Sequence, residues 1–310
     1  MWNAARFVLM NCEEFGKRDA LVATMHEQNK SESEKWILAR FSKTLAEVET
    51  QLALYRFDLV AQALYEFTWN DFCDWFVELA KPALASADKA VADSTRHTLL
   101  TVLEALLRAL HPIIPFVTEE IWHEIAPKLG RNADSISTQT YPRAADYAVD
   151  ASAEAETEWL KAIVSQLRRI RSEMNIAPSK PIPLLFAAGN EADRARAAKF
   201  AHAIAFLART ESQRWLDTGE SEPASAAAII GDMKLLIPLA GLIDVDAEKA
   251  RLAKEIQRLE AEIAKSNAKL GNFGANTPAA VVEQEKQRIS DRTIELNGLR
   301  EQAQRLSSTT

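Results

Sequence analysis

The densest apolar pattern of the chain lies between residues 65 and 82. Large apolar residues recur there at steps of four and three: Tyr65, Trp69, Phe72, Phe76 and Leu79. Acidic residues occupy the other side of the same pattern: Asp71, Asp74 and Glu78. The spacing predicts an amphipathic helix from about Phe57 to Lys81 that ends at Pro82. Because this spacing accounts for the rings, we expect Trp69 and the neighbouring Trp75 to pack in the core of a helical bundle.

Further helical patterns fill the first 175 residues, at 2–14, 33–52, 94–110, 116–125 and 152–175. The pattern at 94–110 carries too many leucines for a surface helix, so it is predicted to lie at the centre of the bundle. Prolines at 112 and 115 end it. The polar stretch from 16 to 31 is predicted to be a loop.

The pattern changes after residue 181. Short apolar runs at 182–187, 213–216, 226–230 and 234–239 predict strands, and 191–208 predicts a helix. Glycines and one proline separate these runs. A small α+β module is therefore predicted.

A heptad pattern begins after residue 246. Its first seam comprises Leu252, Ile256, Leu259, Ile263, Ser266 and Leu270. After turn-forming residues at 271–278, a second seam comprises Val282, Ile289, Leu296, Leu299, Ala303 and Leu306. Two such helices predict an antiparallel coiled-coil hairpin roughly 35 to 40 Å long.

The predicted fold is therefore mainly α, in three parts. Residues 1–150 form a helical bundle, residues 151–245 a junction helix with the α+β module, and residues 246–310 the coiled-coil arm.

Charge and composition limit the classes of function. The 310 residues carry a formal net charge of −7, which argues against a protein that binds nucleic acid through overall charge alone. Residues 247–306 are the relatively basic part, with 11 Lys and Arg against 9 Asp and Glu. No apolar run is long enough for a membrane span. Two separate cysteines, Cys12 and Cys73, suit a reducing cytoplasm. We expect a cytoplasmic protein with neither a membrane nor a DNA partner.

Catalytic motifs are missing from the sequence. Glu120 and His123 form one ExxH, the repeating unit of di-iron bundle sites. Such sites need a second ExxH and further glutamates, and the sequence contains no second ExxH. We therefore predict no catalytic residue, metal or cofactor in this chain.

Several segments together resemble a known family. They are Trp-Asn-Ala-Ala-Arg-Phe at 2–7, Trp-Ile-Leu at 36–38, Tyr-Arg-Phe-Asp at 55–58, Phe-Cys-Asp-Trp-Phe at 72–76, Lys-Pro at 81–82 and His-Pro-Ile-Ile-Pro-Phe at 111–116. These segments resemble the anticodon-binding domain of class I aminoacyl-tRNA synthetases and, within that class, the valyl-tRNA synthetase family. A terminal coiled-coil arm after Pro238–Asp244 is typical of the same subgroup, whereas isoleucine enzymes usually end in a cysteine-based zinc module.

The resemblance implies a tRNA-binding role. The ATP-binding fold of the family, with its HIGH and KMSKS motifs, and the editing domain have no counterpart here, so ATP and Mg²⁺ are expected to act in parts that this chain lacks. The chain alone is expected neither to hydrolyse ATP nor to charge valine tRNA. The alternatives are a coiled-coil scaffold protein and a part of an isoleucyl-tRNA synthetase.

The resemblance also implies contact residues. Asn3, Arg6 and Phe7 border the anticodon pocket in the family, and an exposed ring there could stack on an unpaired base. The alternative is that Phe7 packs in the bundle. Further candidates for the tRNA backbone and outer corner are Arg168, Arg171, Lys265, Lys269, Arg288 and Arg292. Arg168 and Arg171 are candidates because positive charge is concentrated on their helix, and the alternative is that they form a solvated face. For the arm residues, the alternative is that they pair with acids across the hairpin.

Overall fold

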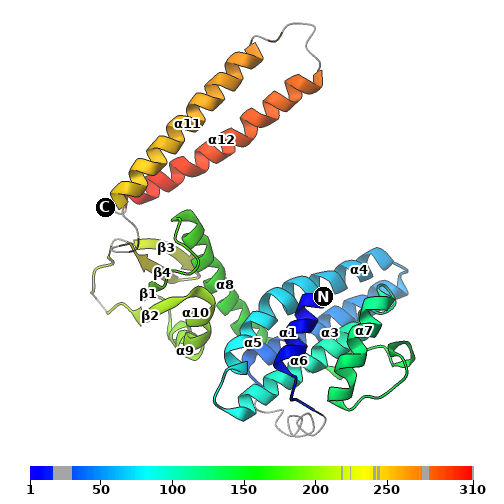
Figure 1. Ribbon diagram of the computed structural model, residues 1–310. Coiled ribbons are helices and arrows are strands. Elements are labelled where there is room, and N and C mark those ends of the chain that lie inside the picture. Colours follow the sequence, from blue (N-terminus) through cyan, green and yellow to red (C-terminus); the bar gives the residue numbers. More distant parts are fainter. Residues whose placement is uncertain are drawn as a thin grey trace. The chain divides into compact units, whose positions relative to one another are not determined.

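A computed structural model describes residues 1–16, 30–217, 219–223, 225–239, 242, 245–271, 273 and 279–308. The chain divides into two compact units, Met1–Lys161 and Ala162–Thr310, which are described separately (Figure 1). The boundary between them falls within the helix α8 (Ala151–Glu173). The prediction of a mainly α fold with a small α+β module is confirmed. The three-part division at residues 150 and 245 stays a prediction, and most of the predicted loop at 16–31 lies outside the described residues.

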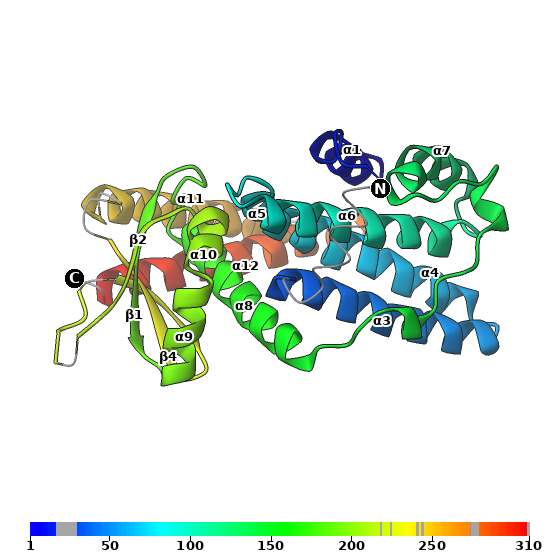
Figure 2. The same ribbon diagram turned by 90° about the horizontal axis from the view of Figure 1, so that it is seen from below.

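The first unit is a helical bundle. Its longer helices are α1 (Trp2–Asn11), α3 (Glu32–Ala53), α4 (Phe57–Glu66), α5 (Val77–Leu84), α6 (Lys89–Leu110), α7 (Pro115–Ile125) and the first part of α8. A π-helix, η2 (Phe67–Phe76), joins α4 to α5, and three short 3₁₀ turns follow α7: η3 (Ala126–Leu129), η4 (Ile136–Thr138) and η5 (Ala144–Asp146). In Figure 2, α3 runs alongside α4 and α6, with which it is in contact.

The centre of the bundle is α6, as its leucine content predicts. Leu99, Leu103 and Leu106 are completely buried. Neighbouring helices are fixed to α6 by buried polar contacts. Glu34 on α3, part of a capping box with Ser31, accepts hydrogen bonds from Ser94 and Thr98 on α6.

The predicted helix from Phe57 to Lys81 is wrong in its geometry. Residues 67–76 form a π-helix, in which Val77 N–H bonds to the carbonyl of Phe72, five residues earlier. The buried positions are Phe67, Thr68, Asp71, Phe72 and Phe76, and those on successive turns are four or five residues apart.

Because a π-helix has more residues per turn than an α-helix, some side chains predicted to be buried are exposed, and one predicted to be exposed is buried. Tyr65 and Trp69 are 64% and 50% exposed, although the α-helical spacing predicts that they are buried. Asp71, predicted on the polar side, is buried and bonds to Arg40 at 3.0 Å. Burial raises the pKa of Asp71, and the nearby Arg40 opposes that rise.

Pro82 does not end the helix. It lies inside α5, which continues to Leu84. Proline lacks the N–H that would bond to the carbonyl four residues earlier, so one hydrogen bond of the helix is missing at this point.

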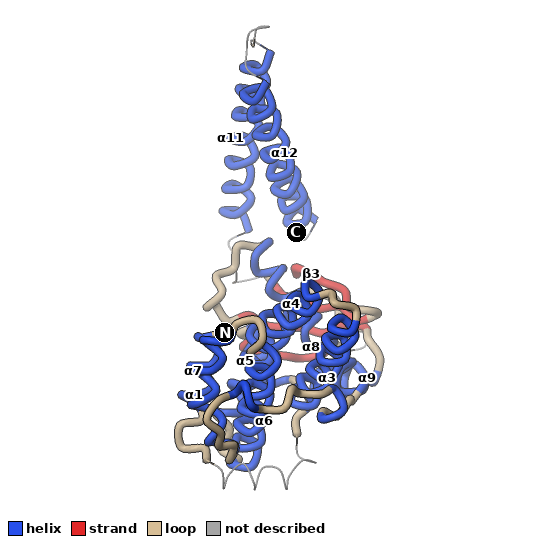
Figure 3. Tube along the Cα trace, turned by 90° about the vertical axis from the view of Figure 1, so that its right-hand side faces the viewer, coloured by secondary structure: helices blue, strands red, loops and turns tan. Residues whose placement is uncertain are grey.

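The second unit contains a four-stranded sheet, whose strands are drawn in red in Figure 3. The strands are β1 (Ile182–Ala188), β2 (Thr210–Trp215), β3 (Ser225–Ile230) and β4 (Met233–Pro238), in the order β2-β1-β4-β3. β1 and β2 are parallel, and the other pairs are antiparallel. The predicted helix at 191–208 is interrupted at Phe200, which gives α9 (Glu191–Lys199) and α10 (Ala201–Ala208). Together they form the crossover that a parallel strand pair needs.

The same unit contains the helical hairpin of α11 (Val245–Gly271) and α12 (Ala279–Ser308), which pack against each other. We call this hairpin the arm. Its most buried positions are Leu252, Leu259 and Ser266 on α11 and Glu285 and Leu296 on α12. The seven-residue steps from Leu252 to Ser266 agree with the predicted heptad seam. Glu285 is also buried, although it is not one of the residues of the predicted second seam.

Candidate nucleic-acid interface

The candidate site for RNA in the first unit lies on α1. Ala5 and Val8 are buried on the side of α1 that packs on α6 and α7. Asn3 and Arg6 are exposed, and Phe7 is half-buried. The structure therefore brings the three predicted residues together on one turn of a helix that the core holds in place.

Asn3 and Arg6 have no side-chain partner among the described residues, so their polar groups are available to a ligand. The Phe7 ring has one cationic neighbour, since Lys81 Nζ lies 5.8 Å from its centroid. Lys81 also pairs with Glu78 on the same helix. No pattern in the sequence points to a role for Lys81, which lies next to Pro82 in one of the segments that carry the family resemblance.

The arginines of α8 differ in their surroundings. Arg168 is exposed. Arg171 is buried, and its guanidinium donates hydrogen bonds to the carbonyls of Ala177, Ala208 and Arg209 at 2.9 to 3.1 Å. Burial lowers the pKa of Arg171, with a further contribution from Arg209, although arginine remains charged in proteins. Because these donors are bonded to the backbone of its own unit, Arg171 could contact a phosphate only by sharing or breaking those bonds, and the phosphate contact stays a prediction.

Three of the four candidate cations on the arm pair with acids of the arm. Lys269 contacts Glu285 at 2.8 Å across the hairpin, and Arg288 contacts the same carboxylate at 3.4 Å. Arg292 contacts Glu262 at 2.9 Å, also across the hairpin. This is the alternative that the sequence left open for these residues.

Lys265 is the exception among the four. Its side chain is exposed and has no partner among the described residues. It is therefore the arm candidate whose charge is fully available to a phosphate. Lys269, Arg288 and Arg292 are already paired with acids, so they could contact RNA only while sharing or breaking those pairs.

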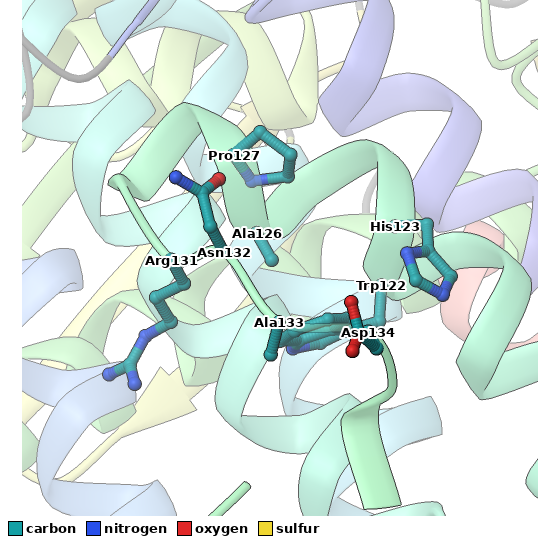
Figure 4. A pocket seen from close by; sticks show the side chains of 8 residues that line it. All are labelled: Trp122, His123, Ala126, Pro127, Arg131, Asn132, Ala133 and Asp134. Atoms are coloured by element: carbon teal, nitrogen blue, oxygen red, sulfur yellow. The ribbon is translucent and has the colours of Figure 1, made fainter. Parts of the chain in front are cut away.

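A small cavity of about 290 Å³ lies beside α7 (Figure 4). Its lining comprises Trp122, His123, Ala126, Pro127, Arg131, Asn132, Ala133 and Asp134. His123 is 3.0 Å from Glu119, and Arg131 is 3.5 Å from the buried carboxylate of Glu104. Both side chains therefore have an acidic partner within the bundle, and His123 contacts Glu119 rather than Glu120 of the ExxH. Among the described residues, no group of three or more His, Cys, Asp or Glu side chains could hold a metal ion.

Comparison with known proteins agrees with this division into a bundle and an arm. The family model described as "Anticodon-binding domain of tRNA ligase" matches residues 34–186. The model described as "Valyl tRNA synthetase tRNA binding arm" matches residues 244–307. The first match begins after α1, so it does not include Asn3, Arg6 or Phe7.

Curated relatives match over almost the whole chain. "Valine--tRNA ligase" from Xanthomonas campestris pv. campestris (strain B100) is 56% identical over 310 residues, which cover 99% of this chain and 32% of the relative. Proteins of the same name from Stenotrophomonas maltophilia (strain K279a) and Xylella fastidiosa (strain M12) are each 53% identical to this chain. The first match covers 99% of this chain and the second 97%, and each covers 32% of the relative. The chain thus spans about a third of the length of these relatives.

A helical bundle with an anticodon-binding match, followed by a coiled-coil arm, defines a part of an aminoacyl-tRNA synthetase. Within that class, the chain belongs to the valyl-tRNA synthetase family. The alternative of the isoleucine subgroup is therefore set aside. No helix in the described part of the chain combines the length and apolar character that crossing a membrane requires.

Proposed function

We propose that this chain is the tRNA-binding part of a valine–tRNA ligase. In this proposal, the bundle of residues 1–150 binds the anticodon loop of valine tRNA at Asn3, Arg6 and Phe7. The arm of residues 246–310 contacts the outer corner of the tRNA, and residues 151–245 connect the two. The acceptor end is thereby presented to a catalytic part that this chain does not include.

The observation that carries the proposal is the arrangement on α1. A half-buried ring lies beside Lys81, and two neighbouring polar side chains have no protein partner among the described residues. Such a ring provides a surface for an unstacked base, while an arginine and an asparagine provide donors for base edges and phosphates. On α8 and the arm, Arg168 and Lys265 are the exposed candidates for backbone contacts, and Lys269, Arg288 and Arg292 contribute while bonded to their acids.

The remaining chemistry of such a ligase lies outside this chain in the proposal. ATP and Mg²⁺ act in the part of the ligase that the chain does not span, and the chain holds no cofactor of its own. Alone, it neither hydrolyses ATP nor charges tRNA. We place this activity in the cytoplasm, with tRNA as the partner and neither DNA nor a membrane involved.

A gel-shift titration with valine tRNA and isoleucine tRNA tests the proposal. We expect the chain to bind valine tRNA more tightly, because the two differ at the anticodon that the α1 site contacts. Equal affinity for both would contradict recognition of the anticodon. No binding to either tRNA would favour the coiled-coil scaffold alternative.

A further inference from the structure

A row of exposed aromatic side chains lies along α4 and the residues that flank it. We call it the α4 ridge: Tyr55, Phe57, Tyr65 and Trp69. These side chains are 79%, 63%, 64% and 50% exposed, although the chain is only 7% aromatic. Phe57, Tyr65 and Trp69 lie on one row of positions four residues apart, in which Ala61 occupies the position between Phe57 and Tyr65. Positions four residues apart form a continuous ridge on a helix. Contiguous exposed apolar surface of this kind marks an interaction site.

The rings of the ridge are arranged against one another. Tyr65 and Trp69 lie parallel, with an interplanar angle of 1° and centroids 6.4 Å apart. Tyr55 and Phe57 meet edge to face at 6.4 Å. Tyr55 also adopts a φ of 56°, a left-handed backbone conformation that non-glycine residues rarely adopt. Two ring pairs thus present their faces and edges on one side of α4, which gives a partner a contiguous aromatic surface.

Charge indicates which kind of partner fits this surface. Between residues 54 and 80 the sequence contains one cation, Arg56, and the exposed acids of this stretch are Asp58, Glu66 and Asp74. The two other acids of the stretch are already paired, since Asp71 is buried against Arg40 and Glu78 contacts Lys81. Arg56 donates two hydrogen bonds to Asp58, at 2.9 and 2.7 Å, so its charge is neutralised. Phosphates would be repelled here, in contrast to the α1 site with Arg6 and Lys81. An apolar protein surface suits exposed Tyr, Trp and Phe rings with a polar rim.

We propose that the α4 ridge is an interface for another part of the same ligase, within the two thirds of the relatives' length that this chain does not span. The bundle would be fixed to that part through the four rings. The proposal rests on membership of the family and on the exposed surface, and it does not depend on where tRNA binds. A failure of the tRNA experiments therefore leaves it unaffected.

Hydroxyl-radical footprinting of two proteins tests this interface. One is the chain alone, and the other is the Xanthomonas campestris ligase in which this chain replaces the matching 310 residues. We expect the oxidation rates of Tyr65 and Trp69 to fall at least tenfold in the full-length protein. Phe206 on α10, which is 46% exposed, is the internal control and should react similarly in both.

A paired variant supplies a second measurement. Tyr65→Gln combined with Trp69→Gln should leave the unfolding midpoint of the chain alone unchanged and lower that of the full-length protein by several degrees. Phe206→Gln should change neither.

Three results would overturn the proposal. Unchanged oxidation in the full-length protein would exclude the interface. Protection of the chain alone that increases with its own concentration would identify a second copy as the partner. Protection of the chain alone on addition of valine tRNA would identify the ridge as an RNA surface.

Discussion

Lys269 on α11 donates a hydrogen bond of 2.8 Å to Glu285 on α12, whose carboxylate is almost completely buried in the seam of the arm. Arg288 lies 3.4 Å from the same carboxylate. One acid therefore connects the two helices at a position where a heptad seam normally carries an apolar residue. Polar seam residues of this kind fix the register of a coiled coil.

The stability of the arm should depend on the ionisation of Glu285. The hydrogen bond from Lys269 lowers the pKa of Glu285, and Ser266 and Arg288 contribute further. Because the folded pKa lies below the unfolded one, the stabilisation is present above the unfolded value, about 4.3, and is lost as the pH falls through the folded value. Circular dichroism should show Glu285→Gln unfolding earlier than the parent at pH 7, with the difference disappearing in acid. Glu283→Gln, an exposed neighbour, is the control, and an equal effect of both variants would refute a role for burial.

Arg171 should be a structural residue of the second unit. Arg171→Met removes three hydrogen bonds to carbonyls and should reduce the free energy of unfolding by about 2–4 kcal/mol. Denaturant titration measures this loss, with the exposed Arg169→Gln as control. A loss of tRNA affinity without a loss of stability would instead support the phosphate contact predicted from sequence.

Local signals in the sequence predict most of the fold. The leucines of α6 and the heptads of the arm each depend on residues a few positions apart, so a single sequence contains them. The π-helix at 67–76 is different, because α-helical spacing also fits its sequence and the wider turn results from tertiary packing. For this reason, the α-helical spacing predicts the wrong face for Tyr65 and Trp69, which are exposed.

Only part of the candidate site could be predicted from the sequence, because some of its contacts join residues that are far apart in the chain. Asn3, Arg6 and Phe7 lie within one helical turn, and their proximity follows from spacing alone. The role of Arg171 depends on carbonyls 6 to 38 residues away, which no local pattern reveals. Likewise, which arm cations are paired depends on how α11 and α12 align, and only the structure singles out Lys265.

Phe7 should contribute base stacking to tRNA binding. Phe7→Ala should weaken the binding of valine tRNA by about 1–3 kcal/mol, or roughly 5- to 150-fold in Kd. Circular dichroism checks that the fold is intact. Phe15→Ala, which removes a buried ring that follows α1, is the control for packing effects. Equal affinity of Phe7→Ala and the parent for tRNA would contradict the α1 site.

The arm should contribute phosphate contacts that salt weakens. Deleting residues 247–306 should lower the affinity for valine tRNA and flatten the dependence of log K on log salt concentration, because each lost phosphate contact reduces the slope by about one. Lys265→Gln should account for about one such contact, since its charge has no acidic partner among the described residues. Lys89→Gln, an exposed lysine of the first unit that pairs with Asp93, is the control and should leave the slope unchanged. A slope that is the same with and without residues 247–306 would indicate that the arm binds something other than tRNA.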